Sequence, residues 1–161
     1  MMKLLHAHHC PWDEHTFLGA IENGNIDNIR WLMDNQCPSS YQVANMAVRV
    51  GDLKVLDYLF DRGFVFNSLS VYYAAREGKV NALEWLEAHQ INYRDSQNAF
   101  SAAAQVGNIE TMQWLMDKKA LCGTEVYKSA GLQNNLSTLE WLKNSGCPYD
   151  CLLYTSPSPR D

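Results

Sequence analysis

The sequence predicts an all-α fold: a solenoid of short helix-turn-helix repeats joined by short loops. The first observation is an aromatic–leucine pair that recurs at spacings of 27, 27, 29 and 27 residues: Trp31-Leu32, Tyr58-Leu59, Trp85-Leu86, Trp114-Leu115 and Trp141-Leu142. The second is a turn residue seven positions before each aromatic, with an alanine four positions earlier still. Repetition at a fixed period of this length indicates a stacked repeat architecture.

The second helix of each unit follows its turn residue, which is Gly24, Gly51, Gly78, Gly107 or Asn134. Apolar residues occupy the second, fifth and eighth positions after the turn, as in Ile26, Ile29 and Leu32 of the first unit. Apolar positions three residues apart line one face of a short helix. We therefore expect this helix to bury that face against its neighbours.

The first helix precedes the turn. Phe17, Ala20 and Ile21 show the i, i+3, i+4 spacing of an amphipathic helix, and Phe100, Ala103 and Ala104 repeat it. The small alanines allow another helix to pack closely. Because neither helix can bury its apolar face alone, each unit must stack on the next.

The turn between the two helices has its own signature. Glycine suits the left-handed residue that ends a helix, and asparagine is the usual substitute, as at Asn134. The next residue is a capping type in four units, able to accept hydrogen bonds from the free amides of the second helix: Asn25, Asp52, Asn108 and Asn135. Lys79 cannot cap in this way, so we expect a weaker helix start in the third unit.

The spacing divides residues 1–150 into a partial unit at 1–9, five units at about 10–36, 37–63, 64–90, 91–119 and 120–146, and the start of a sixth at 147–150. We expect this segment to be a slice of a longer array, with apolar surface at both ends that promotes self-association. Residues 151–161, CLLYTSPSPRD, lack helical spacing and hold two prolines among serines. They resemble the translation of a transposase sequencing adapter, so we expect a non-native, disordered tail.

The A-x-x-x-G-[ND]-[LI] core, followed by the aromatic–leucine pair, resembles the two-helix core of ankyrin repeats. The first unit reads HCPWDEHTFLGAIENGNIDNIRWLMDN and a sixth opens with GCPYD. These resemble the short 27-residue repeats, with CPWDE-type loops, of arrays from protists and large DNA viruses. The resemblance implies a tight loop in place of the longer β-hairpin of the common repeat. TPR and HEAT repeats, with periods of about 34 and 40–47 residues, fit poorly.

The composition excludes several functional classes. Thirteen basic and eighteen acidic residues give a net charge of −5, which disfavours a nucleic-acid groove. No apolar stretch approaches the roughly 18–20 residues needed to cross a membrane. Five cysteines are too few for a disulfide scaffold, so we expect an intracellular, cytoplasmic protein, in the host cell if the source is viral.

The cysteines and histidines do not form a predicted site. Cys10, Cys37 and Cys147 share one repeat position, and equivalent positions of stacked helices lie about 8–10 Å apart. A disulfide needs less than about 7 Å between Cα atoms, so we expect a small apolar position here and a free thiol at Cys122. The potential zinc ligands crowd on one helix end and its loop instead of two separated stretches, so no metal is expected: His6, His8, His9, Cys10 and His15.

No catalytic motif is present: the sequence lacks G-x-S-x-G, a P-loop, G-x-G-x-x-G and H-E-x-x-H. We therefore expect no cofactor and no enzymatic activity. The tryptophans keep an invariant place beside a leucine, so we interpret them as packing residues between units and not as a platform for bases.

The resemblance implies that a protein partner binds the concave face formed by the first helices and the loop tips. By register, the exposed positions lie five, two and one residues before each turn, and they include Ala102 in the fourth unit. Aromatic, methionine and arginine side chains are enriched at interfaces. The candidate contacts are Met46, Arg49, Tyr73, Arg76, Glu77 and Gln105, with Tyr93 and Arg94 in the longer loop of the fourth unit.

We therefore predict a protein–protein interaction scaffold. Two alternatives stay open: a recognition segment of a larger ubiquitin ligase or other multidomain enzyme, and a structural or decayed reading frame without a partner. The candidate contacts could equally be ordinary solvated side chains.

Overall fold

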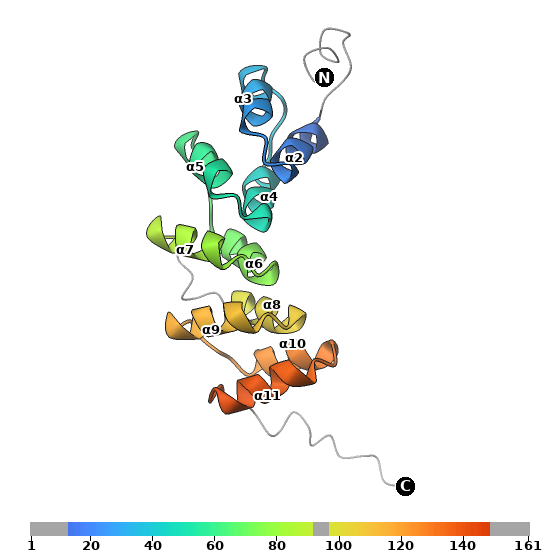
Figure 1. Ribbon diagram of the computed structural model, residues 1–161, viewed down its shortest axis with the longest axis vertical. Helices are drawn as coiled ribbons and strands as arrows, with labels where there is room; N and C mark the ends of the chain where they lie inside the picture. The colour runs from blue at the N-terminus through green and yellow to red at the C-terminus, as the bar shows by residue number, and fades with distance from the viewer. Residues whose placement is uncertain (1–12, 92–96, 149–161) are drawn as a thin grey trace.

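The computed structural model describes residues 13–91 and 97–148, where the regular secondary structure is α-helix only (Figure 1). The prediction of an all-α fold is confirmed for these residues. In the same two ranges, no helix has the length and apolar character required to span a membrane. The helices are α2 (Glu14–Glu22), α3 (Ile26–Asp34), α4 (Gln42–Val50), α5 (Leu53–Asp61), α6 (Ser68–Arg76), α7 (Val80–Ala88), α8 (Gln97–Val106), α9 (Ile109–Asp117), α10 (Glu125–Leu132) and α11 (Leu136–Asn144).

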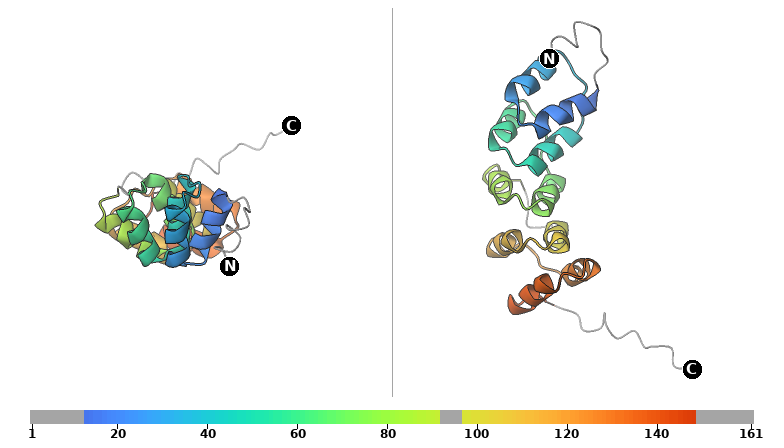
Figure 2. Two further views of the ribbon diagram at one scale, coloured as in Figure 1. Left: turned by 90° about the horizontal axis from the view of Figure 1, so that it is seen from above. Right: turned by 45° about the vertical axis from the view of Figure 1, so that its right-hand side comes forward.

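The helices follow one another as pairs along the long axis of the molecule (Figures 1 and 2). The first helices of the pairs, α2, α4, α6, α8 and α10, pack consecutively against one another. The second helices, α3, α5, α7 and α9, contact their neighbours more sparsely on the other side. The chain therefore forms two columns of short helices, of which the column of first helices is the more closely packed.

The turn inside each pair has the predicted left-handed backbone. The φ angle is +61° at Gly24, +68° at Gly78 and +51° at Asn134. In four of the five described pairs, the residue after the turn donates its backbone N–H to the alanine carbonyl five residues earlier, at 2.9 Å from Lys79 to Ala74; in the other pair, Gly51 itself donates to Ala47. The former hydrogen bond is the mark of a Schellman motif, so the alanine is also the backbone acceptor that closes the first helix.

The predicted caps of the second helices are also confirmed. The side-chain oxygens of Asn25, Asp52, Asn108 and Asn135 accept hydrogen bonds from backbone N–H groups in the first turns of α3, α5, α9 and α11. Lys79 makes no such bond at the start of α7, as predicted.

A second set of left-handed residues ends the second helices, and sequence reasoning missed it. These residues are Gln36, Gly63, Gln90, Lys119 and Gly146. The residue after each donates to the carbonyl of the buried leucine five positions earlier, for example from Ile91 to Leu86 at 2.9 Å. Because glutamine or lysine occupies three of these positions, no glycine signal marks them in the sequence.

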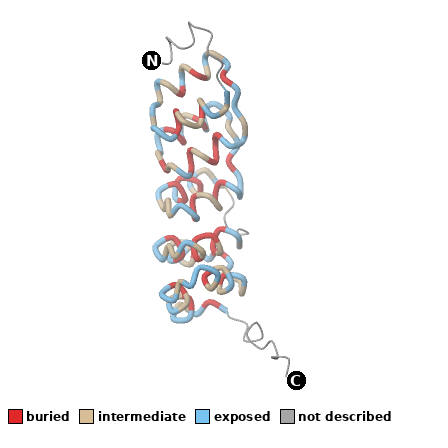
Figure 3. Tube along the Cα trace, turned by 90° about the vertical axis from the view of Figure 1, so that its right-hand side faces the viewer, coloured by how far each residue is buried: buried red, intermediate tan, exposed pale blue. Residues whose placement is uncertain are grey.

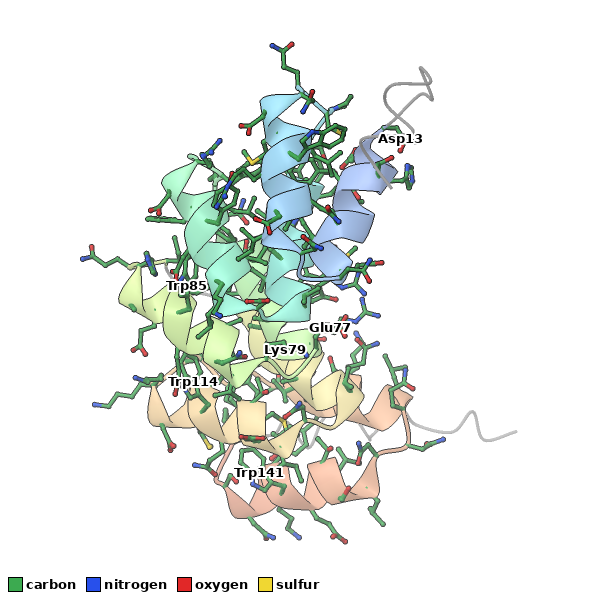
Figure 4. The ribbon with its side chains drawn as sticks, turned by 45° about the horizontal axis from the view of Figure 1, so that its top comes forward. Asp13, Glu77, Lys79, Trp85, Trp114 and Trp141 are labelled. Atoms are coloured by element: carbon green, nitrogen blue, oxygen red, sulfur yellow. A yellow bond between two sulfur atoms is a disulfide. The ribbon has the colours of Figure 1, made fainter. Side chains whose placement is uncertain are left out.

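The core lies between the two columns, and buried positions recur in every pair (Figure 3). The leucine of each aromatic–leucine pair is at most 1% exposed. Trp85 is buried, and Trp31, Trp114 and Trp141 are partly buried against the core, in agreement with their interpretation as packing residues. Trp85, Trp114 and Trp141 follow one another on the side of the second helices (Figure 4).

The prediction of a free thiol at Cys122 is wrong. Cys122, before α10, and Cys147, after α11, form a disulfide with 6.0 Å between their Cα atoms. The prediction compared only equivalent positions one repeat apart, and Cys122 lies two residues off that position, where the loop brings it nearer. The expectation that the repeat position of Cys10, Cys37 and Cys147 forms no bridge is also wrong for Cys147, whereas Cys37 is buried and free. Cys10 lies outside the described residues.

Candidate functional site

The candidate site is the surface of the first helices α4, α6, α8 and α10, called here the inner face. Of the predicted contacts, Arg49, Arg76 and Glu77 are exposed there, and Met46, Tyr73 and Gln105 are partly buried. Tyr93 and Arg94 lie outside the described residues. Four of the described contacts, Met46, Arg49, Tyr73 and Gln105, line two hollows between neighbouring helices, and Arg76 and Glu77 line neither.

The first hollow lies between α4 and α6 and has a volume of about 260 Å³. Residues 42, 45, 46 and 49 follow the i, i+3, i+4, i+7 spacing of one helix face, so α4 turns all four side chains toward it. The lining consists of Tyr41, Gln42, Asn45, Met46, Arg49 and Tyr73. Three of the predicted contacts therefore meet in one place.

Arg49 is held across this boundary by two interactions. Its Nε donates to the Oε1 atom of Glu77 at 3.2 Å, and its guanidinium carbon lies 6.0 Å from the centre of the Tyr73 ring. Both partners are substantially exposed, and such surface pairs contribute only about 0.2–1 kcal/mol. The ion pair orients Arg49 and compensates its charge. Arg49 and Glu77, both predicted as partner contacts, are therefore bonded to each other.

The second hollow is larger, about 820 Å³, and lies between α6, α8 and α10. Gln105 lines it, whereas the other predicted contacts do not. Its described lining is Phe66, Asn67, Ser68, Leu69, Tyr72, Gln90, Ile91, Asn98, Ser101, Ala102, Gln105 and Ser129.

The prediction that Ala102 is exposed is wrong: its exposed fraction is 2%. Its neighbours Ala99, Ala103 and Ala104 are buried as well. These small side chains let α8 pack closely between α6 and α10, which covers the position that register alone placed on the surface.

Two tyrosines separate the hollows. Tyr72 lines the second hollow and Tyr73 the first, and their rings meet edge to face with centres 5.3 Å apart. Sequence reasoning missed Tyr72, Leu69 and Ser101 because it considered only positions five, two and one before the turn. Positions six and nine before the turn lie on the same helix face and would have found all three.

The described lining of the two hollows carries little charge. Among the described residues that line the two hollows, only Arg49 carries a side chain ionised at neutral pH. The lining is instead suited to contacts through aromatic rings, amides and hydroxyls.

The cysteine and histidine candidates form no described metal site. In residues 13–91 and 97–148, no group of three or more potential ligands is positioned to hold a metal ion. His6, His8 and His9 lie outside those ranges. His15 is exposed, with its Nδ1 atom 3.2 Å from the carboxylate of Asp13, whose pKa is lowered mainly by the hydrogen bond from the Thr16 backbone N–H.

Among the described residues, Cys37 is the free cysteine, and it is buried. Burial, and secondarily the charge of Asp13, raises the pKa of the Cys37 thiol. Its sulfur donates to the Asp13 carbonyl at 3.4 Å. Because the thiolate is the reactive form, a raised pKa makes Cys37 a structural residue.

No protein-family model matches the chain, and a search of curated proteins finds none similar to it.

Proposed function

We propose that this chain is a protein-interaction module, an ankyrin-like repeat array that binds a protein partner on its inner face. The repeated local structure supports the array: each described unit has a left-handed turn residue after its first helix and another after its second. The consecutive packing of first helices supports it too. Stacked units of this kind create an extended surface, which is what repeat proteins use for binding.

The pair of neighbouring hollows on the inner face is the observation that carries the proposal. Tyr73, Met46 and Arg49 meet at the first, and Tyr72 continues the surface into the second. Tyrosine, methionine and arginine are enriched in interfaces, and binding energy concentrates in such side chains where a partner excludes water from them.

Site-specific photocrosslinking tests the proposal. A photoreactive phenylalanine at Tyr73 is expected to crosslink a specific protein in extract of the source cell. The control position is Glu84, which is exposed on α7, on the opposite column. The captured protein, once purified, is then titrated by calorimetry.

Tyr73→Ala is expected to weaken that binding by about 30-fold, the effect of a hot-spot residue. Glu84→Ala is expected to leave the affinity unchanged. Equal crosslinking at positions 73 and 84, or an affinity that survives Tyr73→Ala, would contradict a partner site on the inner face.

We also propose that the chain self-associates through its end surfaces. Leu132 is 71% exposed and Leu136 is 67% exposed on the last helix pair. Apolar residues gathered on one surface favour association. Light scattering should show a mass that rises with concentration, and Leu132→Glu together with Leu136→Glu should reduce it. A clean monomer at tens of micromolar would contradict this proposal.

A further inference from the structure

We infer that the partner segment on the inner face is an extended polypeptide that is uncharged over the second hollow and carries an acidic side chain for Arg76. This inference rests on the proposed function. It adds the chemistry of the partner, which follows from how charge is distributed over the first helices.

The charges on α4, α6, α8 and α10 are few and nearly all paired. Arg49 is paired with Glu77 at 3.2 Å, and Lys128 with Glu125 at 3.4 Å. The α8 helix carries no charged residue. Arg76 is the one charged residue in the described parts of these four helices whose side chain has neither an ion pair nor a hydrogen bond. The inner face therefore presents one uncompensated positive charge, although the whole chain has a net charge of −5.

Arg76 is not among the residues that line the second hollow, but helix register places it beside that hollow. It is four residues after Tyr72 on α6, and residues i and i+4 share a helix face. Gln105 occupies the same repeat position in the next unit and lines the hollow itself. A segment that lies in the hollow therefore passes beside the guanidinium of Arg76, which can hold a carboxylate through paired hydrogen bonds.

The lining of the hollow selects an uncharged segment. Asn67, Asn98 and Gln105 bring amide groups that both donate and accept, and Ser101 brings a hydroxyl. These groups match the N–H and C=O groups of an extended backbone, while Phe66 and Leu69 offer apolar surface for a side chain. The described lining holds no charged residue, so a charged side chain placed against it would lose water without gaining a counter-ion there.

The dimensions fit a short stretch of chain. Neighbouring helices lie about 8–10 Å apart, so the path from α6 to α10 covers about 16–20 Å. An extended chain advances about 3.3–3.6 Å per residue, which gives about five or six residues. The partner motif is thus a short neutral stretch with Asp or Glu at the end that meets Arg76.

Peptide selection on the intact 161-residue chain tests the inference. A phage-displayed library of random dodecapeptides is selected, and each enriched peptide is synthesised with its acidic residue kept, changed to Gln or changed to Lys. Fluorescence anisotropy should show the acidic form binding about tenfold or more tightly than the Gln form, because hydrogen bonds to charged groups are the strong ones.

Charge reversal provides the decisive comparison. In Arg76→Glu the order should invert, with the Lys form binding best. Lys54→Glu makes the same charge change on the exposed surface of α5 and should leave the order of the three forms as in the original chain. Circular dichroism should show equal helix content for both variants.

A further variant separates failure of this inference from failure of the proposed function. Ser101→Trp places a bulky indole in the second hollow and should abolish binding. If Ser101→Trp abolishes binding but the acidic and Gln forms bind equally, the inference is overturned and the proposed function stands. If binding survives Ser101→Trp and Tyr73→Ala alike, both are overturned. Failure to enrich any peptide also overturns the inference.

Discussion

The helix pairs α4–α5 and α6–α7, called here the middle region, are linked by polar groups that reach from the later pair back to the earlier one. Asn81 donates to the Gly51 carbonyl at 2.8 Å, and the Trp85 indole donates to Asp57 at 2.6 Å. In the last pair, α10 and α11, the corresponding links lie within the pair. The Cys122–Cys147 disulfide joins its two ends, and the Tyr127 hydroxyl donates to the Cys147 carbonyl at 3.0 Å.

The two regions also differ in how much they bury. Helices α6 and α7 each bury four residues, whereas α10 and α11 each bury two. A pair with a described neighbour on one side only has less apolar contact to stabilise it, and a covalent link offsets the difference by restricting the unfolded chain. The comparison teaches that the same helical motif can be held by packing or by a crosslink.

Core truncation should separate the regions most clearly. Leu56 in α5 and Leu142 in α11 are both 0% exposed. Leu→Ala in a core costs about 2–5 kcal/mol, with the larger values where the surroundings cannot relax. We expect Leu56→Ala in the upper half of that range and Leu142→Ala in the lower half. Hydrogen exchange resolved by helix measures both losses, and a larger loss for Leu142→Ala would break the comparison.

Removal of the disulfide should affect the last pair selectively. The bridge joins residues 25 apart, and closing a loop of that size corresponds to about 3 kcal/mol. In Cys122→Ser we expect exchange protection of α10 and α11 to fall while that of α4–α7 is unchanged. Reductant should reproduce the effect in the original chain and add nothing in the variant. Equal loss of protection along the whole chain would argue against a local role.

The turn residues should respond in opposite directions. Gly78 has a φ of +68°, and a Cβ there would lie 1.8 Å from the amide nitrogen of Asn108, which caps α9. Gly78→Ala should cost about 1–2 kcal/mol from the left-handed backbone, with further loss from the displaced cap. At exposed Asn134, φ +51°, Asn134→Gly should stabilise by less than about 1 kcal/mol. Denaturant titration with a fixed slope measures both, and a neutral Gly78→Ala would contradict the close contact.

Replacing one buried hydroxyl should make the last pair resemble the middle region. The Thr138 side chain is 0% exposed, and its Oγ1 atom has no hydrogen-bond partner. Valine occupies the equivalent position at Val55. Because an unsatisfied buried hydroxyl is unfavourable, Thr138→Val should raise the stability of α11 by about 1 kcal/mol. Thr138→Ser keeps the hydroxyl, loses a methyl and should be destabilising; a gain from serine would contradict this explanation.

Much of the helical pattern could be predicted because it depends on neighbours within one or two turns. Gly24 and Asn134 mark left-handed positions in the sequence because glycine and asparagine adopt such angles more readily than most residues. Asn25 could be predicted as a cap because its side chain reaches the backbone of the next turn. The missing cap at Lys79 follows from the same rule. The positions of Met46 and Arg49 on α4 and of Tyr73 on α6, all on the inner face, also follow from register within each helix.

The tertiary structure decided what depends on the distance between units. The pairing of Arg49 with Glu77, the burial of Ala102 and the bond between Cys122 and Cys147 each join or bring together parts of the chain that no local rule relates. The two hollows arise in the same way, from the spacing of packed helices. The sequence by itself determined where the first helices end, where the chain turns and which second helices are capped, because those rules act over a few residues. Which side chains meet was decided only when the packed helices brought distant segments together.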